Sequence, residues 1–184
     1  RTIQYAHSQG VIHRYLKPQN MIVGDYGETI VLDWGLASVI DAPCKPTESI
    51  LLHDDPEVLT RAESLKTLGG AIMGTPAYMP PEQARGELAS ITRRSDVYSL
   101  GATLYHLITG NVPFTDGPLD ELIERVKLGE IPQASIISPR VEKPLSAIAA
   151  KAMQVEPRGR YGDCGELLED VQKFLADQPI SAYR

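Results

Sequence analysis

The stretch His13-Arg14-Tyr15-Leu16-Lys17-Pro18-Gln19-Asn20, together with Asp33-Trp34-Gly35, decides how this chain is interpreted. Two short apolar, β-branched runs lie between these stretches, at residues 21–23 and 29–32. The tetrapeptide Gly24-Asp25-Tyr26-Gly27 separates the runs and is typical of a turn, so the pair is predicted to form a β-hairpin. A polar loop therefore leads into the hairpin, and an acidic turn follows it.

Helical periodicity dominates the chain from Pro80 onward. The strongest helix is predicted over Ser95–Thr109, with Ser95 as the candidate N-cap and Gly110 after its end. Further helices are predicted at 81–85, 119–128, 145–153 and 165–176, and residues 1–9 resemble the end of a helix that stops at Gly10. Residues 36–74 are irregular and are predicted to form a long surface loop, with a helix favoured only near Pro56–Leu68. The expected structure is mainly α-helical, with one or two small β-hairpins.

The ordered set of motifs resembles the catalytic loop and metal-binding turn of bacterial, eukaryotic-like Ser/Thr protein kinases. In that family the loop begins His-Arg-Asp, an Asn follows five residues after the Asp, and the Asp accepts or orients the substrate hydroxyl proton. Here that position holds Tyr15. The order of the motifs carries the resemblance, because Asp-Trp-Gly alone is an ordinary strand-end turn and Lys17 alone is an ordinary surface charge. The resemblance implies the α+β protein kinase fold, of which this chain would be the mainly α-helical C-terminal lobe.

The resemblance also implies a site for ATP and Mg²⁺. Lys17 would reach the transferred phosphate, where a fixed cation offsets developing negative charge. Asn20 would supply an amide oxygen and Asp33 a carboxylate to the magnesium ion, which prefers oxygen ligands. Together these three residues would form the lower half of a nucleotide-phosphate site, with Tyr15 at the position of the proton acceptor.

A second group of motifs resembles the end of a kinase activation segment. It reads Gly74-Thr75-Pro76-Ala77-Tyr78-Met79-Pro80-Pro81-Glu82, and Thr75 matches the residue that marks Ser/Thr rather than Tyr specificity. In the family, an Arg at the position of Arg14 often meets a phosphate on the activation loop. Candidate carriers of that phosphate, each of which is also an ordinary loop hydroxyl, are Thr60, Ser64 and Thr67.

Structural roles follow from the same resemblance. His13 would support the catalytic loop and would not act as a base. Asp96 would accept hydrogen bonds from the loop backbone, although an acid near a helix N-terminus is favourable on its own. Arg160 would form a buried ion pair with Glu82, at the end of the activation segment, where an unmatched charge is costly.

The resemblance covers nearly the whole chain and divides it into segments. The catalytic loop and metal-binding turn would occupy residues 1–35, the activation segment with an insertion 36–82, the helical subdomain 83–176 and a C-terminal tail 177–184. The N-terminal lobe of the family carries a Gly-rich loop and a Val-Ala-Ile-Lys strand, which are expected before Arg1 and are absent here. That missing N-terminal lobe is therefore the first expected partner.

Composition narrows the classes of function. The chain has 184 residues, about one domain, and a net charge of −6, which favours neither nucleic acid nor an anionic membrane surface. No run approaches the roughly 18 apolar residues that a membrane helix needs. Cys44 and Cys164 match no disulfide or zinc pattern and indicate reduced thiols. We expect a cytoplasmic protein, or the cytosolic part of a longer membrane-anchored one, that acts on a protein substrate or binds a protein partner.

Tyr15 bears directly on activity. A neutral Tyr, with a reference pKa of about 10, accepts hydrogen bonds more weakly than a carboxylate does, and it is larger. Base positioning contributes about 10²–10⁴-fold to turnover, so activity is expected to be nearly lost. Three interpretations stay open: a segment of a Ser/Thr kinase impaired at Tyr15, a pseudokinase that binds or scaffolds partners, and an unrelated helical domain, which the motif order disfavours.

Overall fold

The computed structural model describes residues 1–39, 76–115 and 117–183. The helices and strands of these residues are α1 (Thr2–Ser8), β1 (Val11–Ile12), β2 (Met21–Val23), β3 (Thr29–Val31), β4 (Ser38–Val39), α3 (Pro81–Ala84), α4 (Arg93–Thr109), α5 (Leu119–Leu128), α6 (Ala134–Ile137), α7 (Lys143–Ala152) and α8 (Cys164–Leu175). Short 3-10 turns lie at Pro18–Asn20 (η1), Trp34–Leu36 (η2), Pro76–Tyr78 (η3), Leu88–Ser90 (η4), Pro157–Gly159 (η5) and Ser181–Tyr183 (η6). The helix expected near Pro56–Leu68 lies outside the described residues.

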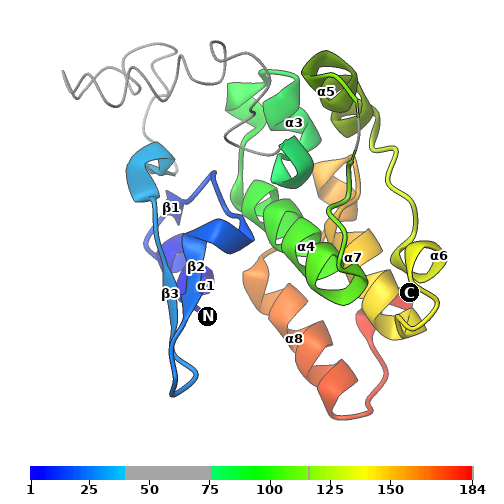
Figure 1. Cartoon of the computed structure of the whole chain (residues 1–184). Coiled ribbons are helices and arrows are strands. Elements are labelled where there is room, and N and C mark those ends of the chain that lie inside the picture. The colour runs from blue at the N-terminus through cyan, green and yellow to red at the C-terminus, as the bar shows by residue number, and fades with distance from the viewer. Residues whose placement is uncertain (40–75, 116, 184) are drawn as a thin grey trace.

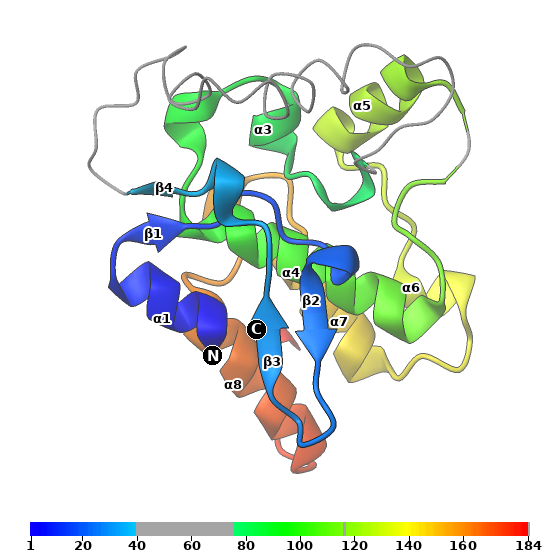
Figure 2. The same cartoon turned by 60° about the vertical axis from the view of Figure 1, so that its left-hand side comes forward.

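The predicted hairpin is present. β2 and β3 pair in antiparallel fashion, with Met21 opposite Val31 and Val23 opposite Thr29. β1 and β4 form a second antiparallel pair, whose position the sequence did not predict because strands of two residues are too short to show alternation. Figures 1 and 2 show residues 1–39, which carry both sheets, gathered on one side of α4. The predicted fold class, mainly helical with small two-stranded sheets, is confirmed.

Helix α4 is the centre of the helical part (Figure 1), where it packs against α7 and α8. Val97 of α4, Ile148 and Ala152 of α7, and Leu167 of α8 are buried together in one hydrophobic cluster. Gly101 lets α4 and α7 approach closely, since a Cβ at this position would lie 2.6 Å from the Cβ of Ala152. A close-packed core of this kind fixes the position of every side chain that α4 presents to its neighbours.

The N-terminus of α4 differs from the prediction. The helix begins at Arg93, and its N-cap is Thr92 rather than Ser95. Thr92 Oγ1 accepts a hydrogen bond from Arg94 N at 3.3 Å, and Ser95 Oγ accepts one from Thr92 N at 3.0 Å. This reciprocal arrangement is a capping box, in which two side chains satisfy backbone N–H groups that have no partner inside the helix.

Residues 177–183 pack against the helical subdomain. Ile180 is buried in the same cluster as α7 and α8. Asp170 of α8 accepts hydrogen bonds from Ser181 N at 2.8 Å, from Ala182 N at 3.0 Å and from the hydroxyl of Tyr161 at 2.8 Å. Asp170 and Ile180 together make this segment part of the fold rather than a free tail.

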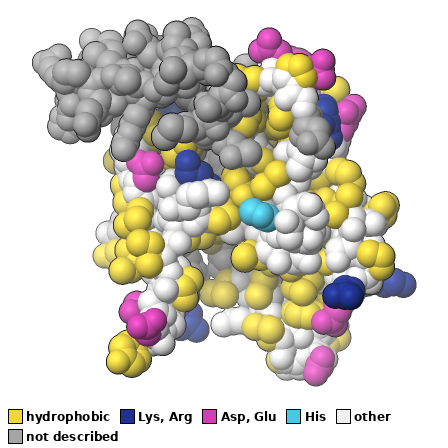
Figure 3. Space-filling model, in the orientation of Figure 1, with side chains coloured by type: hydrophobic (Ala, Val, Ile, Leu, Met, Phe, Trp, Pro, Cys, Tyr) yellow, Lys and Arg dark blue, Asp and Glu magenta, His cyan; other side chains and the backbone are white. Residues whose placement is uncertain are grey.

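The hairpin carries apolar side chains on its surface. Val23 is 71% exposed and Tyr26 97% exposed, while Ile22 and Ile30 are about half exposed. Figure 3 shows hydrophobic side chains over this part of the molecule. In the described part of the chain, no helix combines the length and the apolar character that crossing a membrane requires.

Candidate functional site

The loop that follows β1 is held by one buried carboxylate. Asp96 of α4 is fully buried, and its two oxygens accept the backbone N–H groups of His13 and Arg14, each at 2.9 Å. Arg14 has a φ of 69°, an uncommon conformation for a residue other than glycine. That backbone conformation is strained by about 1–3 kcal/mol, which the charge-assisted hydrogen bonds to Asp96 offset.

His13 joins this loop to the acidic turn after β3. Its ring is buried, with Nε2 at 3.0 Å from the carbonyl of Leu32, and its Nδ1 accepts the backbone N–H of Tyr15 at 3.3 Å. The ring lies 4.5 Å from that of Trp34, whose Nε1 donates to the carbonyl of Val31 at 2.9 Å. Both ring nitrogens of His13 therefore have hydrogen-bond partners in the backbone. This geometry fits a residue that supports the loop better than one that transfers protons.

Tyr15 and Lys17 are in direct contact. Lys17 Nζ donates a hydrogen bond to Tyr15 Oη at 2.7 Å and lies 4.1 Å from the centre of its ring. Both side chains are partly buried. Tyr15 therefore presents a phenol at this point of the loop, and the ammonium of Lys17 is bound to it.

Asn20 and Asp33 lie at the same end of the hairpin. Asn20 immediately precedes β2, and its carbonyl accepts the backbone N–H of Leu32 at 2.8 Å. Leu32, which directly precedes Asp33, therefore lies opposite Asn20. The side-chain amide of Asn20 donates to the carbonyl of Tyr15 at 2.9 Å, which leaves Oδ1 for another partner. Asp33 has a φ of 61° and is exposed. The two residues thus offer an amide oxygen and a carboxylate from one edge.

This donor set fits magnesium carried by a nucleotide better than a free metal ion. The described residues contain no group of three His, Cys, Asp or Glu side chains that could hold a metal ion. Magnesium is commonly held by one or two protein oxygens together with substrate phosphates and water. Asn20 and Asp33 match that pattern in chemistry and number.

A buried ion pair joins the start of α3 to the segment before α8. Arg160 donates to both carboxylate oxygens of Glu82, at 2.7 and 2.8 Å, and both side chains are almost fully buried. Ser95 Oγ also donates to Glu82, at 2.7 Å. Burial alone raises the pKa of Glu82, but the hydrogen bonds and charge of Arg160 outweigh it and lower the pKa below its ordinary value. The predicted partners, 78 residues apart in sequence, are therefore in contact.

Comparison with known proteins decides the family. The family model for the protein kinase domain matches residues 1–172. The chain belongs to the protein kinase domain family. A serine/threonine-protein kinase PknD of Protochlamydia amoebophila is 40% identical over 177 residues, covering 95% of this chain. Proteins of the same name from Chlamydia felis and Chlamydia trachomatis serovar D are 36% and 32% identical, each over 97% of this chain.

The chain spans 17–19% of the length of these kinases. The residues that the family model matches include both small sheets and the helices as far as most of α8. The candidate residues Thr60, Ser64, Thr67 and Thr75 lie outside the described residues, so their predicted roles remain predictions. Arg14 Nε is buried and has no hydrogen-bond partner among the described residues.

Two sets of contacts that no motif predicts stabilise the helical part of the chain. Tyr78 Oη lies 2.6 Å from Nδ1 of His106, which ties η3 to α4, and burial raises the pKa of Tyr78. His7 Nε2 lies 2.8 Å from Asp96, and the thiol of Cys164 approaches His7. No sequence motif predicts these pairs, because their members are far apart along the chain and only the fold brings them together.

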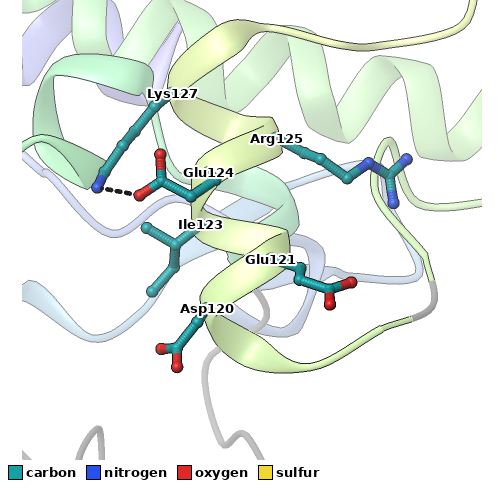
Figure 4. Close-up of a pocket in the computed structure, with 6 residues that line it drawn as sticks. All are labelled: Asp120, Glu121, Ile123, Glu124, Arg125 and Lys127. Atoms are coloured by element: carbon teal, nitrogen blue, oxygen red, sulfur yellow. Dashed lines mark hydrogen bonds and ion pairs between the residues drawn. The ribbon is translucent and has the colours of Figure 1, made fainter.

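A cavity of about 720 Å³ lies against α5. Figure 4 shows the α5 side chains that line it, which are Asp120, Glu121, Ile123, Glu124, Arg125 and Lys127. Among the described residues, none of the predicted site residues lines this cavity, so it plays no part in the candidate site.

Proposed function

We propose that this chain is the C-terminal lobe of a Ser/Thr protein kinase in which Tyr15 blocks phosphotransfer while the magnesium–nucleotide ligands are retained. The observation that carries the proposal is the 2.7 Å hydrogen bond from Lys17 Nζ to Tyr15 Oη. It affects two functional positions at once, the proton acceptor and the cation that would meet the transferred phosphate.

The chemistry of the phenol supports the loss of turnover. At neutral pH a phenol is uncharged, and its oxygen is a poorer acceptor than a carboxylate. Here that oxygen already accepts a hydrogen bond from Lys17, so its own O–H is directed to other acceptors. A substrate hydroxyl would therefore meet a competing donor where it needs an acceptor. The same contact restrains the Lys17 ammonium, whose charge would otherwise stabilise the phosphoryl group in flight.

The retained ligands support nucleotide binding. Asn20 Oδ1 and the Asp33 carboxylate would hold magnesium, and bound magnesium–ATP would supply the phosphoryl group and neutralise part of its charge. Asn20 is nearly buried and is held by its hydrogen bond to the Tyr15 carbonyl, so its oxygen is pre-oriented. Protein Ser and Thr hydroxyls are the proposed acceptors, on the basis of the family.

The decisive experiment replaces Tyr15 with Asp in a chain that also carries a kinase N-terminal lobe. We expect Tyr15→Asp to raise phosphotransfer from magnesium–ATP to a Ser/Thr peptide by at least about 10²-fold, because base positioning contributes about 10²–10⁴-fold. Tyr15→Phe is the matched control, since it releases Lys17 but supplies no carboxylate, and it should stay inactive. Turnover by the unchanged chain, or an inactive Tyr15→Asp variant that still binds magnesium–ATP, would overturn the proposed block.

A second candidate function is a binding or scaffold module without phosphotransfer. It is favoured by the same combination of a replaced base and retained Asn20 and Asp33, which permits nucleotide-linked binding without turnover. The two candidates diverge in the Tyr15→Asp variant. Restored turnover supports an impaired kinase, whereas no turnover together with tight retention of a protein partner supports the scaffold.

A further inference from the structure

Three buried polar side chains from separate helices meet beneath the catalytic loop. Cys164 is the first residue of α8, His7 lies near the end of α1, and Asp96 lies in α4. The Cys164 Sγ is 3.7 Å from His7 Nδ1, and His7 Nε2 is 2.8 Å from Asp96 Oδ2. Their exposed fractions are 6%, 3% and 0% respectively. The proposed function assigns no role to Cys164 or to His7.

The contact with Asp96 determines where the proton of His7 lies. An ionised carboxylate only accepts hydrogen bonds, so Nε2 must carry the hydrogen that it donates to Asp96. Asp96 Oδ2 also accepts the backbone N–H of His13, and Oδ1 accepts that of Arg14. With one hydrogen on the His7 ring, at Nε2, the buried Nδ1 presents a lone pair, which requires a donor.

The thiol of Cys164 is the group that meets this requirement. Burial, reinforced by the negative charge of Asp96, raises the pKa of the Cys164 thiol to about 12, so the sulfur keeps its proton at neutral pH. A thiol is a weak donor, and 3.7 Å is a normal separation for a hydrogen bond that involves sulfur. In this arrangement Cys164 donates a hydrogen bond to His7, and His7 donates one to Asp96.

We propose that Cys164 is a positioning residue, whose thiol holds the His7 ring against Asp96 and thereby steadies the backbone of His13 and Arg14. Cys164 acts through His7 and Asp96, without touching Tyr15, Lys17 or a substrate. The inference does not depend on whether the chain transfers phosphate, because it concerns the geometry of the loop itself.

The alternative role of Cys164, as a small hydrophobic side chain that fills space, predicts the opposite ranking of variants. If packing alone matters, Cys164→Ala should be tolerated better than Cys164→Ser, since a buried hydroxyl is costly in an apolar position. If hydrogen-bond donation matters, Cys164→Ser should preserve the arrangement, and Cys164→Ala should lose it.

The test uses nuclear magnetic resonance on the whole 184-residue chain labelled with ¹⁵N. In the unchanged chain and in Cys164→Ser, we expect His7 to carry hydrogen at Nε2 and its Nδ1 resonance to show a hydrogen-bonded lone pair. In Cys164→Ala, the Nδ1 resonance should move downfield toward that of an unbonded nitrogen. Amide exchange at His13 and Arg14 should become about tenfold faster, as expected for the loss of one hydrogen bond from the chain.

Ile180→Val provides the control, because it removes one methyl group from the same hydrophobic cluster without touching His7. It should leave both the Nδ1 resonance and the two amide exchange rates unchanged. The proposal is overturned if Cys164→Ala behaves like the unchanged chain or if His7 carries hydrogen at Nδ1. Should Cys164→Ala not fold, Cys164→Ser alone decides, since loss of the Nδ1 hydrogen bond in that variant contradicts the proposal.

Discussion

Among single residues, Glu82 has the largest predicted effect on stability. Glu82→Gln keeps the shape of the side chain but leaves the guanidinium of Arg160 buried without its counter-charge. Removing one partner of such a pair lowers the free energy of unfolding by about 3–5 kcal/mol. Urea unfolding followed by circular dichroism measures the change.

The chain offers a matched surface pair as a control. Glu124 and Lys127 are also 2.7 Å apart, but Glu124 is 64% exposed. Glu124→Gln should change the free energy of unfolding by less than about 1 kcal/mol, as exposed pairs do. If the two substitutions changed the free energy of unfolding equally, burial of the Glu82–Arg160 pair would add nothing to stability.

The same Glu82 variant has a second readout in acid. The pKa of Glu82 is lowered in the folded chain, so its ion pair stabilises the fold above the unfolded pKa, and that contribution is lost as pH falls through the folded pKa. As pH falls below the ordinary pKa of a glutamate, the urea midpoint of the unchanged chain should therefore fall more steeply than that of Glu82→Gln. Part of the fall should persist in the variant, because hydrogen bonds from Ser181, Tyr161 and Ala182 outweigh the effect of burial and lower the pKa of Asp170 as well.

At the scale of elements, the contact between α4 and α7 depends on Gly101. Gly101→Ala would place a Cβ 2.6 Å from that of Ala152, and overpacking of this kind destabilises a core by about 1–3 kcal/mol. A double-mutant cycle with Ala152→Gly tests the cause, since the second substitution makes room for the first. Additive changes in the free energy of unfolding would mean that the two positions do not clash.

The sequence predicted the long elements better than their ends. Apolar residues at helical spacing located α4, α5, α7 and α8, although α4 is buried on most of its faces rather than along one stripe. The predicted start of α4 lies too far along the sequence, because Arg93 and Arg94 are not apolar and both Thr92 and Ser95 are good capping residues. Strand β4 could not be predicted, because its two residues are defined only by their pairing with β1.

At the scale of the whole molecule, residues 177–183 close the fold. A chain that ends at Ala176 would expose the site of Ile180 and deprive Asp170 of the backbone donors of Ser181 and Ala182. We expect it to lose about 2–4 kcal/mol in the free energy of unfolding, from lost apolar burial and unmade hydrogen bonds.

A chain that ends at Ala182 is the matched comparison for this truncation. It keeps Ile180 and both backbone donors to Asp170, so its thermal midpoint should remain close to that of the full chain. If both truncations melt like the full chain, the last segment is not part of the cooperative unit.

The candidate site shows the same division between what motifs reveal and what only the fold reveals. The pairing of Glu82 with Arg160 could be predicted because both belong to ordered motifs of a known family. The contact of Cys164 with His7 could not, because it joins residues 157 positions apart that belong to no motif. The bond between Lys17 and Tyr15 also escaped prediction, since it depends on side-chain conformations at adjacent turns.

The dependence of the loop on Asp96 has a consequence for the protein as it is made on the ribosome. The backbone N–H groups of His13 and Arg14 have no carboxylate to donate to until Asp96 has been made, which lies 83 and 82 residues further along the chain. At synthesis rates of about 5–20 residues per second, that interval lasts roughly 4–17 s. During this time the apolar hairpin has neither α4 nor α8 to pack against, so its exposed side chains are a point where chaperones would bind the growing chain.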